Sequence, residues 1–157
     1  MNLPSLWMHL EQWMGEEIAG KRRLAELITE QEMALLANRI DELDRATLAV
    51  DAELTRELER SKRRQRMFVL LAKHWGADAA ALTLGSIVER GGSDAAAIGS
   101  MREELRGAAA IVLKKNRRFA RFASAHSRLV QDTLALVLHG DESVSHTDSG
   151  AVFDARA

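Results

Sequence analysis

The sequence contains no cysteine and no tyrosine, and its 157 residues include one proline, Pro4. Because thiols are absent, disulfide bonds, cysteine-based zinc sites and thiol catalysis are excluded. Residues 1–17 contain no basic stretch, and three glutamates precede any long apolar run, so we expect neither a signal peptide nor a membrane-spanning helix. The simplest interpretation is a cytoplasmic protein that does not insert into membranes.

Hydrophobic residues make up 46% of the chain and charged residues 29%, and alanine, leucine, glutamate and arginine dominate. This composition is typical of helices, and the length fits one domain with its own core. Charge is segregated: residues 1–59 carry 6 basic and 13 acidic side chains, whereas residues 60–121 carry 14 and 5. Antiparallel helices with such opposite charges would attract each other.

Apolar residues recur at helical spacing in three long segments. The first covers residues 5–38, and we expect a thinner contact or a bend near Gly15 and Gly20, because each glycine costs a helix about 1 kcal/mol relative to alanine. The second covers residues 41–76 and follows a tight turn or a kink. Its predicted apolar stripe consists of Leu43, Val50, Leu54, Leu58, Phe68, Leu71 and Trp75.

The third segment, residues 95–139, repeats in steps of three and four over close to six heptads and is expected to end at Gly140. A short helix that begins near Asp78 and ends at Gly91 and Gly92 connects the second segment to the third.

These segments predict an all-α fold, an elongated antiparallel bundle of three long helices plus a short connecting helix, with coiled-coil-like contacts. Residues 1–140 would form the helical domain. Residues 141–157 would form a flexible polar tail that ends in a small hydrophobic motif.

No motif in the sequence points to catalysis. The five histidines lack metal-binding spacing, no glycine-rich loop follows a strand, and nothing pairs two carboxylates in an apolar pocket. His126 is expected to be a hydrogen-bonded histidine at a helix contact. We therefore expect no enzyme, no cofactor and no bound metal.

Two basic runs, residues 60–66 and 114–121, raise the question of nucleic-acid binding. Alternatively, their charges keep long helices in solution and complement the acidic first segment. The sequence pI near 6.5 favours the second interpretation. Phe119 and Phe122 lie on the predicted helix seam, where they are better placed for packing than for stacking on bases, so we expect no nucleic-acid partner.

Large or adaptable apolar side chains widen the stripes of the first and third segments, among them Trp7, Met8, Trp13 and Met14. Core packing is the ordinary explanation. Three slender helices cannot cover such wide stripes along their whole length, and a groove left between them would suit an incoming amphipathic helix.

The order of these features resembles the FlgN family of flagellar export chaperones. The likeness is carried by "EMALLANRIDEL", "ELERSKRRQRMFVLLAKHWG" and "VLKKNRRFARFASAHSRLVQDTLALVLHG", and it covers nearly the whole chain. The family typically has a long helix, a turn, a second long helix, a short connector and a final helix, followed by a polar linker.

The resemblance implies a cytoplasmic chaperone for bacterial flagellum assembly and type III protein export, without catalysis. Such proteins bind the C-terminal helical segments of the hook-associated proteins FlgK and FlgL, prevent their premature assembly and deliver them to the export apparatus. They engage this cargo chiefly through their own C-terminal helix. Mapped onto this sequence, the cargo-binding residues are Phe119, Phe122, Ala123, His126, Leu129, Val130, Leu134 and Val137.

The chain ends in "VFDARA", where the family usually has a tyrosine followed after two or three residues by glycine. Phe153 replaces that tyrosine and Ala157 that glycine. The resemblance makes Val152 and Phe153 a tethered hydrophobic anchor that either folds back on an exposed stripe or docks on the export apparatus, and we favour docking.

A different class of function fits the same helical pattern. A structural coiled-coil adaptor or scaffold without an export role would use its apolar stripes for self-assembly. A chaperone would instead form a stable low-order complex with a partner's terminal helix.

Overall fold

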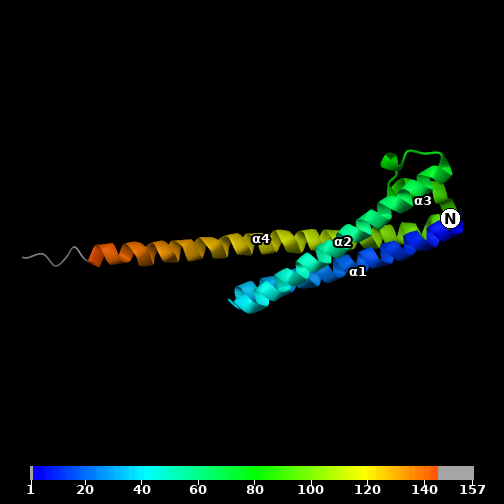
Figure 1. Cartoon of the computed structure of the whole chain (residues 1–157). Helices are drawn as coiled ribbons and strands as arrows, with labels where there is room; N and C mark the ends of the chain where they lie inside the picture. The colour runs from blue at the N-terminus through cyan, green and yellow to red at the C-terminus, as the bar shows by residue number, and fades with distance from the viewer. Residues whose placement is uncertain (1, 145–157) are drawn as a thin grey trace, which may run out of the picture. The chain divides into compact units, whose positions relative to one another are not determined.

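The computed structural model describes residues 2–144, with side chains for residues 2–138. All regular elements in this part of the chain are helical, which confirms the predicted all-α class (Figure 1). Among the described residues, no helix combines the length and apolar character needed to cross a bilayer. The elements are α1 (Leu3–Leu36), α2 (Ile40–Trp75), the 3-10 helix η1 (Ala79–Ala81), α3 (Leu84–Gly91), the 3-10 helix η2 (Gly92–Ala95) and α4 (Ala96–Val144).

The chain divides into two units, and the division falls within the residues of α4. Unit 1 ends at Phe119 and contains α1, α2, the connecting elements and the first part of α4. Unit 2 begins at Ala120, and its described part is the remainder of α4, up to Val144. The helix continues through Gly140, so the predicted end at this residue is wrong; a glycine weakens a helix but does not forbid it.

Local sequence signals set most of the helix ends. The Asn2 side chain caps α1 by accepting a hydrogen bond from the Ser5 amide at 3.1 Å. Gly76 ends α2 in the left-handed conformation, with φ of 60°, as the sequence predicted. The predicted start of the connecting helix at Asp78 is wrong, because Asp78 caps η1, whereas Thr83 caps α3 in a reciprocal capping box with Ser86.

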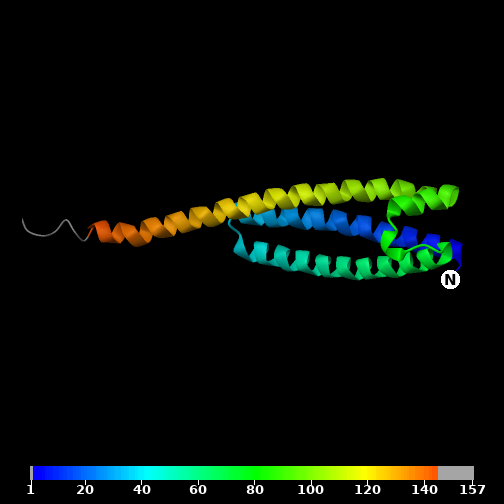
Figure 2. The same cartoon turned by 90° about the horizontal axis from the view of Figure 1, so that it is seen from above.

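In unit 1 the three long helices run up, down and up. Glu16, in the first half of α1, pairs with Arg63 in the second half of α2. Gln31, near the end of α1, donates a hydrogen bond to Thr47 near the start of α2. Helix α2 is therefore antiparallel to α1. The first part of α4 runs parallel to α1. Arg22 of α1 contacts Glu104, and Glu32, further along α1, contacts Arg118, further along α4. The antiparallel bundle of three long helices with a short connecting helix is thereby confirmed (Figures 1 and 2). Helices α1 and α2 are each about 50 Å long.

The apolar core lies around the first half of α1 and the last half of α2. Leu10 of α1, Leu71 of α2, Ile87 of α3 and Ile98 of α4 are fully buried in it. The connecting helix thus closes this end of the bundle. The remaining core members are Leu6, Trp7, Trp13, Met14, Met67, Ala72, Leu82 and Ala95.

The stripe predicted for α2 is wrong in its middle. Leu54 and Leu58 are 47% and 57% exposed, whereas the charged side chains of Glu53 and Arg60 are buried. The seam of α2 therefore runs through charged positions at this level. The physical reason is a set of ion pairs with α1, which takes the place of leucine packing.

Two glycines offer a matched test of packing around the core. A methyl group on Gly91 would lie 2.6 Å from the Ala95 Cβ and 2.9 Å from the Trp7 ring, but one on Gly107 would meet nothing within 4 Å. We expect Gly91→Ala to lower the free energy of unfolding by about 1 to 3 kcal/mol. Gly107→Ala should raise it by about 0.5 to 1 kcal/mol through helix propensity. Denaturant unfolding measures both, and equal effects would contradict the tight contact at Trp7.

Candidate functional site

The predicted cargo-binding residues all lie on α4. Phe119 is the last residue of unit 1 and is partly buried, while the other seven belong to unit 2. Taken by itself, the described part of unit 2 is a single helix, which has no second element against which to bury an apolar face. Large apolar side chains are accordingly exposed there: Leu129 by 64%, Leu134 by 54% and Val137 by 64%.

Helical spacing places these residues on one face. Positions 122, 126, 130, 134 and 137 advance in steps of four and three, and positions 123 and 129 lie beside them. The charged residues of the same segment, Arg121, Arg128 and Asp132, follow each other in steps of seven and four on the opposite side. Unit 2 thus presents an apolar face without charges, the α4 face, which can bury a partner's apolar stripe.

His126 lies within the α4 face and is partly exposed. No hydrogen bond to it is found among residues 2–138, so its expected bond stays a prediction. In the described part of the chain, no group of three or more histidine, aspartate and glutamate side chains is arranged to hold a metal ion.

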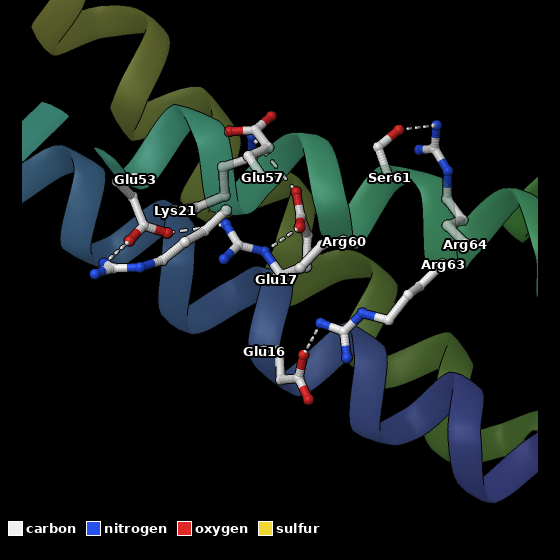
Figure 3. Close-up of polar contacts among 10 residues, drawn as sticks. Glu16, Glu17, Lys21, Glu53, Glu57, Arg60, Ser61, Arg63 and Arg64 are labelled. Atoms are coloured by element: carbon white, nitrogen blue, oxygen red, sulfur yellow. Dashed lines mark hydrogen bonds and ion pairs between the residues drawn. The ribbon is translucent and has the colours of Figure 1, made fainter. Parts of the chain in front are cut away.

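A polar assembly lies inside unit 1, between α1 and α2 (Figure 3). The Arg60 guanidinium donates to the Glu17 carboxylate at 2.8 Å and to the Glu53 carboxylate at 2.9 Å. All three side chains are at least 89% buried. Lys21 extends the assembly by pairing with Glu17 at 3.6 Å. We refer to Glu17, Glu53 and Arg60 as the buried triad.

The backbone at Gly20 makes room for the buried triad. A Cβ atom at this position would lie 2.7 Å from the Arg60 Cζ and 2.9 Å from a Glu53 carboxylate oxygen. Only a residue without a side chain allows the guanidinium to cross the helix this closely. The thinner contact or bend expected near Gly15 and Gly20 stays a prediction, because the structure shows a close approach of Arg60 at Gly20.

Burial and ion pairing act in opposite directions on Arg60. Burial, the largest single influence, acts to lower the pKa of the guanidinium. Hydrogen bonds and charges from Glu17 and Glu53 together outweigh it and raise that pKa above its ordinary value. Arg60 therefore stays charged, and its role is structural.

Ionic and polar contacts also hold α4 on α1 inside unit 1. Arg118 donates to the Glu32 carboxylate at 3.0 Å. Lys115 donates to the carbonyl oxygen of Ala25 at 3.1 Å and to the Thr29 hydroxyl at 2.6 Å. Part of each basic run thus complements α1, as the charge distribution predicted.

Neither a family model nor a curated protein nor a solved structure is similar to this chain at the level required for a match.

Val152 and Phe153, assigned above to docking on the export apparatus, lie outside the described residues. Their proposed role stays a prediction.

Leu136 and Leu138 belong to the predicted apolar pattern of the last helix but not to the mapped cargo-binding set. They are 75% and 68% exposed and widen the apolar surface of unit 2. The buried triad was missed because its members are charged. Glu53 and Arg60 are seven residues apart, a heptad spacing that would have placed them on one seam.

Proposed function

We propose that this protein is a flagellar export chaperone of the FlgN type. Its last helix binds the C-terminal helical segment of a hook-associated protein of the FlgK or FlgL type. One observation carries the proposal: the exposed and uncharged α4 face of unit 2. The order of helices, with a short connector before the last one, gives further support.

The chemistry of the α4 face suits a reversible complex with an amphipathic helix. Such a helix exposes an apolar stripe that aggregates or assembles too early when it is left in water. Full burial of one leucine contributes roughly 1.5 to 3 kcal/mol, so Leu129, Leu134 and a few neighbours suffice to offset the cost of ordering a cargo segment. A complex of this strength can release the cargo to export apparatus components.

Substitutions that introduce charge on the α4 face test whether this face binds the cargo. We expect Phe119→Glu with Leu129→Glu to abolish co-purification with a hook-associated protein, because each carboxylate would be buried against apolar cargo. Since Phe119 is partly buried in unit 1, a second variant, Leu129→Glu with Leu134→Glu, keeps the changes in unit 2. Circular dichroism should show unchanged helix content.

The control places the same charges on another exposed leucine pair, Leu54→Glu with Leu58→Glu on α2. This variant should bind cargo as the unchanged protein does. Cargo binding retained by the α4 variants would count against the proposal. If the free protein instead forms oligomers that the α4 variants dissolve, a coiled-coil scaffold is favoured.

A further inference from the structure

A second exposed surface lies on the last half of α2, and cargo binding on α4 does not use it. Val69 and Leu70 are 55% and 40% exposed there. Val69 lines a groove of about 890 Å³ together with Arg102 of α4, and both apolar residues line a second hollow with Lys62 and Arg66. We call these five residues the α2 patch.

The charge around the α2 patch is positive, although Arg63 at its edge pairs with Glu16. Leu70 and Arg66 also line a third hollow. Together the three hollows are lined by five lysines and arginines but by a single acidic residue, Glu59. Glu59 is already engaged, since it accepts a hydrogen bond from Lys62 at 2.7 Å. Within residues 2–138, no carboxylate lies within salt-bridge distance of Arg66. The Arg102 guanidinium is 3.7 Å from its chain neighbour Glu103.

We infer that the α2 patch binds an acidic amphipathic helix of a second protein, separate from the helix held by α4. Val69 and Leu70 supply an apolar anchor, and the hollows on either side admit the flanking side chains of a partner helix. Arg66 and Arg102 then meet its carboxylates in charge-assisted hydrogen bonds. This assignment gives a role to Lys62 and Arg66 of the basic run 60–66.

The side chains of the α2 patch favour a protein over a nucleic acid. Its exposed apolar groups, Val69 and Leu70, are aliphatic and offer no aromatic ring on which a base could stack. Phosphates would satisfy Arg66 but leave this apolar pair in water. An acidic amphipathic helix covers both kinds of group at once.

The test uses the full chain and a fluorescein-labelled synthetic helix of about 20 residues of leucine, alanine and glutamate. A peptide with lysine in place of glutamate is the comparator. We expect the acidic peptide to bind, more weakly as salt rises, and the basic peptide not to bind. Arg66→Glu with Val69→Asp should weaken binding by at least about tenfold.

The matched control is Leu113→Asp with Lys114→Glu on α4, which makes the same change of charge at a similarly exposed apolar residue. It should change the affinity by less than about twofold. Equal losses in both variants, or equal binding of the two peptides, would overturn the inference. So would tighter binding of duplex DNA or of phosphatidylglycerol vesicles that Arg66→Glu with Val69→Asp abolishes.

The inference stands apart from the proposed function. Leu129→Glu with Leu134→Glu should lose cargo but bind the acidic peptide as the unchanged protein does. Loss of the peptide in that variant would place it on α4 and overturn the inference, whatever the fate of cargo binding.

Discussion

Arg60→Ala is expected to lower the free energy of unfolding by about 3 to 5 kcal/mol. The substitution would leave the buried carboxylates of Glu17 and Glu53 without their shared guanidinium. An unpaired charge in the interior is far more costly than the same charge in water. Denaturant unfolding followed by circular dichroism measures the change, and the helical signal before unfolding should stay close to that of the unchanged protein.

The neighbouring Arg63 supplies the control. It pairs with Glu16, but both side chains are substantially exposed, so Arg63→Ala should cost at most about 1 kcal/mol. Replacing the whole buried triad by apolar residues, Glu17→Leu, Glu53→Leu and Arg60→Met, should recover most of the stability lost in Arg60→Ala. If Arg60→Ala and Arg63→Ala are equally mild, the buried triad does not stabilise the α1–α2 pair.

Leu71→Ala is expected to lower the free energy of unfolding by about 2 to 5 kcal/mol. Leu71 is fully buried where α2 meets the core, so the change removes apolar contacts and leaves a cavity. The residue before it provides the comparison. Leu70 is 40% exposed, and Leu70→Ala should cost less than about 1 kcal/mol.

The same unfolding experiment distinguishes the two leucines. If Leu71→Ala lowers the free energy of unfolding by several kcal/mol more than Leu70→Ala does, Leu71 faces the core and Leu70 does not. This result would establish which side of α2 is buried. Equal costs would mean that α2 is turned differently from the arrangement described.

Much of unit 1 was accessible from the sequence because apolar periodicity reports which face of a helix is covered. The three long helices and the buried Leu71 follow from it, whereas the end of α2 at Gly76 follows from the preference of glycine for the left-handed conformation. Local capping was less accessible. Asp78 and Thr83 are both good capping residues, and only the backbone shows that the first caps η1 and the second caps α3.

The middle of α2 could not be predicted in this way. The apolar spacing of Leu54 and Leu58 is the same as that of leucines in a buried helix contact, although both are exposed. The actual seam depends on Gly20, a residue on another helix that leaves space for Arg60. Contacts between segments distant in the chain carry this information, and spacing within one segment does not.

The α4 face shows a related limit of sequence patterns. A heptad repeat has the same spacing whether a partner covers it or not. The family resemblance assigned the residues of this face, from Phe122 to Val137, and the repeat by itself did not give the exposed fraction of each side chain. Exposure depends on which other elements reach that part of the helix.

The fit between Gly20 and Arg60 bears on how α1 and α2 find each other during folding. If α2 slid by one heptad along α1, Arg60 would face Trp13 or Leu27 instead of Gly20. Neither side chain leaves room for a guanidinium, and Glu17 would lose its partner. The close fit of Arg60 at Gly20 therefore favours this alignment of α1 and α2 over alignments shifted by one heptad.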